Sequence, residues 1–118
     1  MFLELSHTKL DVYQTSKKFV LECYKISRKF PAEENFNLTS QVRRAALSVH
    51  LNIAEGASRK SAIERKRYFE ISRGSIVEID AALDIVFELN YLSKEEMNDV
   101  GELLVRSFQM ISKMIYKS

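Results

Sequence analysis

Apolar residues recur along the chain at alternating steps of three and four, which is the spacing of one face of an α-helix. The first segment with this pattern covers residues 9–30. Its expected buried face is Val12, Ser16, Phe19, Cys23, Ile26 and Phe30. Pro31 follows directly, and proline cannot continue a helix because it has no N–H and its ring clashes with the preceding turn. The pattern predicts a first helix that ends before residue 31.

The second segment, residues 39–55, opens on Thr39 and Ser40, both good N-cap residues, and is followed by Gly56. We expect the helix to end at this glycine, because glycine is common just past a helix C-terminus. The expected buried face is Val42, Ala45, Ala46, Val49 and Ile53. A polar stripe at the same spacing follows another side, with Gln41, Arg44, Ser48, Asn52 and Glu55.

The third and fourth segments, residues 61–90 and 93–116, each open on a serine with a glutamate three positions later, the form of a capping box. In the third, the expected buried residues are Phe69, Ser72, Ile76, Ile79, Leu83 and Val86. In the fourth, they are Met97, Val100, Leu104, Phe108, Ile111 and Ile115. Gly74 lies inside the third segment, where it costs about 1 kcal/mol relative to alanine. We expect the small residues Ala45 and Ala46 to pack closely against it.

Connections of about two to eight residues make sequential helices antiparallel neighbours. The sequence contains no composition shift, internal repeat or low-complexity tract that would mark a domain boundary. The predicted fold class is therefore all-α, an antiparallel up-down-up-down four-helix bundle that forms a single domain over residues 1–118.

Composition narrows the class of protein further. The 118 residues are 46% hydrophobic and 29% charged, and they include only 3 Gly and 1 Pro, too few for the turns of an all-β fold. No apolar run approaches the roughly 18 residues that a membrane span needs, and the first five residues lack the basic flank of a secretory signal. The single Cys23 suits a reducing compartment. These features predict a cytoplasmic protein that does not contact a membrane.

The sequence offers little material for catalysis or metal binding. A di-iron site in a helical bundle needs Glu-x-x-His pairs on two helices. The two histidines, His7 and His50, do not provide such pairs. Neither a phosphate-binding P-loop nor a dinucleotide-binding glycine motif occurs. Cys23 lies on an apolar helical face, where a small core residue is expected rather than a nucleophile. We therefore predict a protein that is not an enzyme and that binds neither metal nor cofactor.

The net charge of +2 hides an uneven distribution. Residues 1–74 carry 14 Lys and Arg against 8 Asp and Glu, whereas residues 75–105 carry one lysine against eight acids. In the third helix, cations gather in the N-terminal half and the acids Asp80, Asp84 and Glu88 in the C-terminal half. The helix dipole disfavours both placements. Contacts with a partner explain such charges better than local helix stability does.

The basic cluster has a functional and an ordinary interpretation. In the functional one, cations near aromatic residues contact the phosphates of RNA or DNA without reading bases. In the ordinary one, they are a solvated helix face. The candidate phosphate contacts are Arg43, Arg44, Arg59, Lys60, Arg65, Lys66, Arg67 and Arg73. An alternative function is a protein-interaction scaffold whose segregated charges drive ring assembly or the docking of a partner enzyme.

The polar stripe of the second helix also has two interpretations. In the first, it is a solvated or half-buried face, with Asn52 and Glu55 satisfied by nearby backbone or arginine groups. In the second, it belongs to a subunit interface of a closed ring, in which basic surface on one copy faces acidic surface on its neighbour. The candidate interface residues are Arg44, Asn52, Glu55, Asp80, Asp84 and Glu88.

The second helix carries a recognisable motif. Residues 38–49 read LTSQVRRAALSV, and residues 52–56 read NIAEG. They resemble the signature of a four-helix-bundle family encoded in intervening sequences of bacterial 23S ribosomal RNA. Similar features occur at residues 10–13, at Gly74-Ser75 with Glu78, and at residues 91–93. One departure is His50, where many members of the family have proline.

The resemblance implies a bundle that assembles into a homopentamer. It also implies a relationship to the accessory proteins of diversity-generating retroelements, which are similarly pentameric and bind nucleic acid and a reverse transcriptase. The expected partners are therefore other copies of this chain, RNA or DNA, and a reverse transcriptase or another protein.

Overall fold

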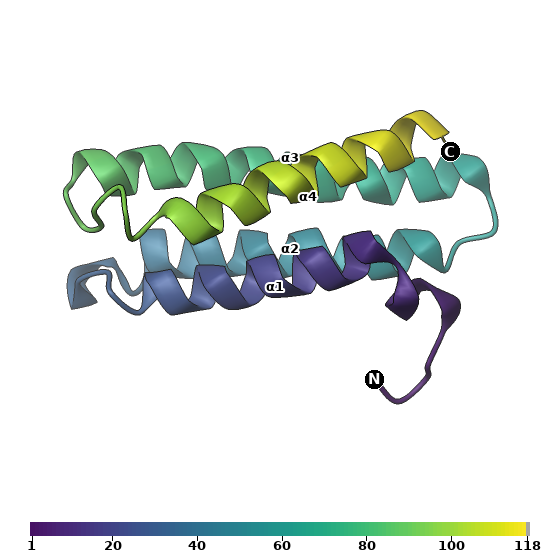
Figure 1. The fold of residues 1–118 in the computed structure, drawn as a ribbon, viewed down its shortest axis with the longest axis horizontal. Helices are drawn as coiled ribbons and strands as arrows, with labels where there is room; N and C mark the ends of the chain where they lie inside the picture. The colour runs from purple at the N-terminus through teal and green to yellow at the C-terminus, as the bar shows by residue number, and fades with distance from the viewer. Residues whose placement is uncertain (118) are drawn as a thin grey trace.

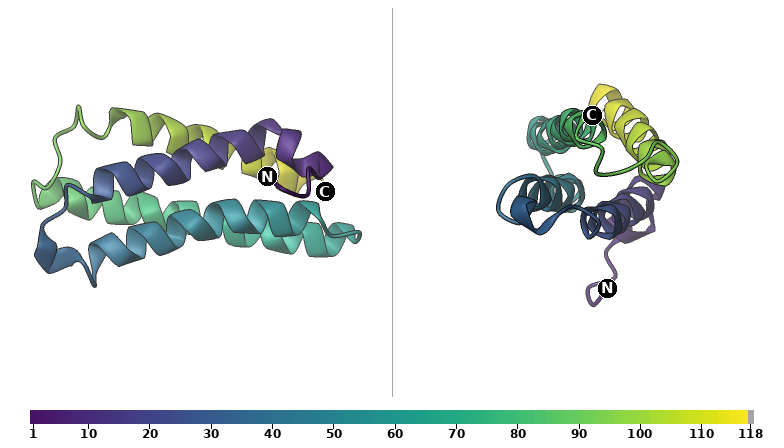
Figure 2. Two further views of the ribbon diagram at one scale, coloured as in Figure 1. Left: turned by 90° about the horizontal axis from the view of Figure 1, so that it is seen from below. Right: turned by 90° about the vertical axis from the view of Figure 1, so that its left-hand side faces the viewer.

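Four antiparallel helices build the protein in the computed structural model, which describes residues 1–117, with Lys9 described by its backbone alone (Figure 1). The elements in chain order are η1 (Ser6–Lys9), α1 (Asp11–Ser27), η2 (Ala32–Glu34), α2 (Leu38–Ala57), α3 (Ala62–Glu88) and α4 (Asn98–Lys117). Each helix contacts its two neighbours in the order α1–α2–α3–α4–α1, and across the described residues no helix contacts the one diagonally opposite (Figure 2). The structure confirms the all-α, up-down-up-down bundle.

The apolar faces expected from the periodicity meet in one core. Every residue expected inside on α1, α2 and α3 is buried, including Cys23. In the fourth segment the expectation was wrong at Phe108, whose side chain is 37% exposed, while the neighbouring Ser107 is fully buried. Met97, also expected inside, precedes α4 and is only partly buried against the core. Both Ser107 and Phe108 fit the helical spacing between Leu104 and Ile111, because one lies three positions and the other four positions after Leu104. Packing selects the small serine for the inside.

The expected start of the third helix is confirmed, whereas the expected starts of the second and fourth helices were wrong. The backbone N–H of Glu64 donates to Ser61 Oγ at 3.3 Å. Before α4, the Glu96 N–H donates to Ser93 Oγ and the Ser93 N–H donates to the Glu96 carboxylate, as in a capping box. These bonds close a turn over residues 94–97, however, and α4 begins only at Asn98. By contrast, α2 begins before Thr39 and Ser40, so neither residue is its N-cap. The helix also continues without interruption through His50.

Both expectations about glycine were wrong. Gly56 does not stop α2, which continues to Ala57. Instead, Gly56 lies where α2 and α3 approach closely, because a Cβ there would lie 2.8 Å from Phe69 Cε1 and 2.9 Å from Tyr68 Cβ. Gly74 is exposed, and no atom lies within 4 Å of the position that its Cβ would occupy. The close contact expected at Gly74 is therefore made at Gly56.

Candidate nucleic-acid interface at the basic end

The antiparallel arrangement separates charge along the long axis of the bundle, which extends 44 Å. One end holds the chain start, the α2–α3 turn and the end of α4 (Figure 1). Residues 1–18, 48–75 and 108–117 form this basic end, with 11 Lys and Arg against 5 Asp and Glu. Residues 19–47 and 76–107 form the acidic end, with 7 against 11. Charges this far apart are screened from each other by physiological salt, where the Debye length is about 8 Å. Each end therefore presents its own sign to a partner.

The structure divides the candidate cations into two groups. Arg59 and Lys60 lie in the turn between α2 and α3, directly before the first turns of α3 with Arg65, Lys66 and Arg67. Arg73 follows on α3. Arg43 and Arg44, however, lie in the N-terminal half of α2, at the acidic end. About 13 residues of helix, or roughly 20 Å at 1.5 Å per residue, separate them from the turn.

Several of these arginines have partners inside the subunit. Arg59 Nη2 lies 2.9 Å from Glu55 Oε2, and its guanidinium lies over the Tyr68 ring. Arg65 Nη1 donates to the backbone carbonyls of Arg59 and Lys60, at 3.1 and 2.6 Å. Arg65 thus reaches back from α3 and fixes the turn that precedes it. This local role reduces the number of donors that it has for an external phosphate.

Arg43 and Arg73 are also engaged within the bundle. Arg43 is half-buried, donates from Nε to Ser27 Oγ at 2.8 Å and lies over the Tyr24 ring. The Arg73 guanidinium lies over the ring of Phe108, 5.9 Å from its centroid. This contact explains how Phe108 is accommodated outside the core, because its ring face covers a cation.

Four of the candidate cations are exposed without such contacts. Lys60, Lys66 and Arg67 surround the α2–α3 turn, and Arg44 lies apart from them on α2. Within residues 1–117, the structure assigns no hydrogen bond, ion pair or ring contact to any of these four side chains. Lys60, Lys66 and Arg67 are therefore the best-placed phosphate contacts among the predicted residues.

The polar stripe of α2 lies partly against α3. Asn52 Nδ2 donates to the Ser48 carbonyl at 2.8 Å, and the hydroxyls of Ser48 and Ser75 are 2.8 Å apart. Glu55 pairs with Arg59, as described above. Asn52 and Glu55 thus have partners inside the subunit, as the first interpretation of the stripe expects. A role for them between subunits stays a prediction.

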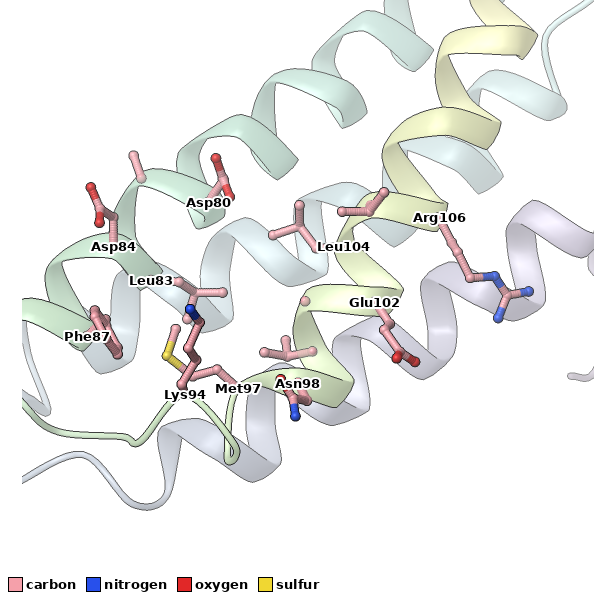
Figure 3. Close-up of a pocket in the computed structure, with 14 residues that line it drawn as sticks. Asp80, Leu83, Asp84, Phe87, Lys94, Met97, Asn98, Glu102, Leu104 and Arg106 are labelled. Atoms are coloured by element: carbon pink, nitrogen blue, oxygen red, sulfur yellow. The ribbon is translucent and has the colours of Figure 1, made fainter.

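A groove of about 940 Å³ opens between α3 and α4 at the acidic end. Two of the predicted interface residues, Asp80 and Asp84, line it from α3, while Glu102 and Arg106 line it from α4 (Figure 3). The third acid, Glu88, is exposed but lies outside the lining. Apolar side chains make up most of the groove wall, so the acids flank an apolar surface.

One cluster at the basic end was missed from the sequence. His50 Nδ1 lies 2.7 Å from Ser16 Oγ, and the His50 ring packs on Tyr13, which also contacts His7 and Lys17. Burial, with Lys17 and His7 nearby, lowers the pKa of His50 below its usual 6.5. The position of Ser16 in the sequence could have predicted this contact, because a serine on a buried, apolar helical face needs a hydrogen-bond partner.

These features define an all-α bundle with a charge-separated long axis. Among residues 1–117, no helix has the length and apolar character needed to cross a bilayer. In the same part of the chain, no three His, Cys, Asp or Glu side chains are grouped as metal ligands would be. The family model for the 23S rRNA-intervening sequence protein matches residues 8–116. The chain therefore belongs to this family, as its second-helix motif indicated. The family description names no catalytic activity, and no curated protein matches the sequence.

Proposed function

We propose that this protein is a non-enzymatic, cytoplasmic, self-associating bundle that binds RNA or DNA by phosphate contacts at its basic end. The observation that supports this proposal is the group formed by Lys60, Lys66 and Arg67, three exposed cations without partners around one turn. Arg65 fixes the backbone of that turn through two carbonyls. Cations held on a fixed turn lose less conformational freedom on binding than cations on a mobile loop.

The contacts are expected to be insensitive to base sequence. Lysine and arginine side chains that meet phosphates set the position of a nucleic acid and carry no base information. Affinity should therefore fall steeply with salt, because each neutralised phosphate releases counterions. The family resemblance implies that five copies act together, which would multiply the number of cations facing one strand.

The test replaces Lys60, Lys66 and Arg67 with glutamine in one variant. Arg65 is kept, because its hydrogen bonds hold the turn. If all three cations contact phosphates, the plot of log affinity against log salt becomes shallower by about 2.7 for duplex DNA and about 2.1 for single strands. A matched control replaces Lys25, Arg28 and Lys94 at the acidic end with glutamine, which removes the same charge.

Affinity and oligomer mass are measured on the same samples. The proposal requires weaker binding in the basic-end variant, unchanged mass, and little effect in the control. Equal losses in both variants would mean that only overall charge matters, which refutes a defined binding surface. Unchanged binding in the basic-end variant would exclude the turn as the site.

The alternative is a scaffold that binds proteins alone, and the groove flanked by Asp80 and Asp84 favours it. This function predicts self-association that responds to salt, with no affinity for nucleic acid in the unmodified protein. Absence of binding at low salt would therefore select the scaffold.

A further inference from the structure

The last turn of α4 carries an aromatic side chain that lies in solvent. Tyr116 is 81% exposed, and within residues 1–117 the structure assigns no hydrogen bond and no ring contact to it. Its ring is therefore open to a flat partner, such as another aromatic ring. Exposure alone is ordinary for a tyrosine, so the surroundings of the ring decide what it can bind.

A hydrogen bond between α3 and α4 places Tyr116 relative to the turn cations. Arg73 Nη1 donates to Ser112 Oγ at 3.4 Å. Tyr116 lies one turn beyond Ser112 on α4, toward the basic end (Figure 1). Lys66 lies two turns before Arg73 on α3, on nearly the same side of that helix, because seven residues make about two full turns. The helices are antiparallel, so both steps lead toward the basic end. Rises of about 6 Å along α4 and about 10 Å along α3 bring Tyr116 and Lys66 to similar heights.

Cations dominate the surface around this ring. Residues 60–73 and 110–117 carry 7 Lys and Arg against 2 Asp and Glu. The two acids are Glu64 and Glu70, both on α3, while the last turns of α4 contribute lysines and no acid. An exposed ring among cations is the combination found in sites for single-stranded nucleic acid, where cations follow the phosphates and aromatic side chains stack on bases.

The two forms of nucleic acid differ in whether a ring can stack on their bases. Inside a duplex, each base lies between its neighbours, and both of its faces are covered. In a single strand, bases can be splayed out and stacked on an aromatic side chain. Cations alone bind both forms, because both carry phosphates. An exposed ring beside phosphate-binding cations therefore favours a single strand over a duplex.

We propose that Tyr116 is a base-stacking residue and that the nucleic acid bound at the basic end is a single strand. The turn cations Lys60, Lys66 and Arg67 hold phosphates, and one base of the same strand lies flat on the Tyr116 ring. Stacking tolerates any base, because every base has a π-face. The contact thus selects single strands without reading their sequence. It rests on the proposed function and specifies the class of nucleic acid.

The test measures affinity for three probes of equal length: a single strand, the same strand in a duplex, and a DNA strand without bases. The first two are made as RNA and as DNA. Tyr116→Leu removes the ring but keeps an apolar side chain of high helix propensity, and Tyr116→Phe keeps the ring. Phe36→Leu is the matched control, because it removes a ring that is 94% exposed at the acidic end. Circular dichroism and light scattering check the fold and the oligomer mass of each variant.

For the single strand, in the RNA or DNA form that the unmodified protein binds more tightly, Tyr116→Leu should lose about 5- to 140-fold in affinity, the value of one stacked base. Its affinity for the duplex and for the strand without bases should not change. The slope of log affinity against log salt should also stay the same, because no cation is removed. Tyr116→Phe and Phe36→Leu should bind every probe as the unmodified protein does.

The proposal is overturned if Tyr116→Leu keeps its affinity for the single strand, or loses affinity equally for all three probes. A changed oligomer mass in Tyr116→Leu would also overturn it, because the ring would then belong to a subunit contact. If the glutamine variant of the turn cations binds more weakly while Tyr116→Leu does not, the proposed function stands and stacking fails. If only Tyr116→Leu binds more weakly, stacking stands and the phosphate contacts at the turn fail. An unmodified protein that binds no probe refutes both.

Discussion

Gly56→Ala provides the sharpest test of how α2 and α3 pack. Inside a helix, alanine is normally more favourable than glycine by about 1 kcal/mol. Here the new methyl group would lie 2.8 Å from Phe69 Cε1 and 2.9 Å from Tyr68 Cβ, whereas carbon atoms pack best at about 3.5–4.0 Å. Phe69 is buried in the core and cannot swing into solvent. The two helices must therefore move apart.

Overpacking of this kind typically costs about 1–3 kcal/mol. After the gain in helix propensity is subtracted, Gly56→Ala should lower the free energy of unfolding by about 1 kcal/mol. The matched control is Gly74→Ala, at a position where nothing lies within 4 Å of the new Cβ. Only the propensity gain applies there, so this variant should be more stable by about 1 kcal/mol. The two variants should differ by about 2 kcal/mol.

Urea unfolding followed by far-ultraviolet circular dichroism measures this difference, since the sequence contains no tryptophan for fluorescence. All samples need the same protein concentration, because self-association makes apparent stability depend on it. If Gly56→Ala stabilises the protein as much as Gly74→Ala does, the close approach of α2 and α3 at Gly56 is wrong.

Three further predictions concern ionisable groups. Burial raises the pKa of the Cys23 thiol to about 12, so a thiol reagent should label the native protein far more slowly than the denatured protein; fast native labelling would contradict the burial. Because the pKa of His50 is lowered below 6.5 in the folded state, the unfolded state takes up the proton first as pH falls below 6.5, and stability should decrease there. Substitution of His50 by Gln should remove this part of the pH dependence, and an unchanged profile would assign it to other groups. Hydrogen bonds from the Ser93 backbone, Lys29 and the Ser93 hydroxyl hold the pKa of Glu96 at about 2; Ser93→Ala should raise that pKa in an NMR titration, and no rise would exclude the hydroxyl as a contributor.

Much of the fold could be predicted from the sequence because burial follows a helical period. The apolar face from Val12 to Phe30, on α1 and just beyond its end, is an example, since each expected residue is buried. Where two choices fit the same period, as with Ser107 and Phe108, periodicity cannot decide and side-chain packing does. The expectations for Gly56 and Gly74 were wrong for a related reason. Whether a missing side chain matters depends on the neighbouring helix, and helical spacing along one segment contains no such information.

The candidate site was predicted in part. The sequence identified the cations near residue 60, but it could not show that Arg65 would be engaged by backbone carbonyls while Lys66 stayed free. It also grouped Arg43 with cations at the other end of the bundle. The pairing of Ser16 with His50 joins residues 34 positions apart, so it depends on the packing of α1 against α2 and has no local signature.

The separation of charge along the bundle has a practical consequence for handling the protein. A sequence isoelectric point near 8.7 suggests weak, uniform basicity. A molecule with opposite ends, however, can be retained on cation-exchange resin through one end and on anion-exchange resin through the other. Near its isoelectric point, end-to-end attraction is no longer opposed by net repulsion. Moderate salt should then increase solubility rather than reduce it, because screening weakens the attraction between unlike ends.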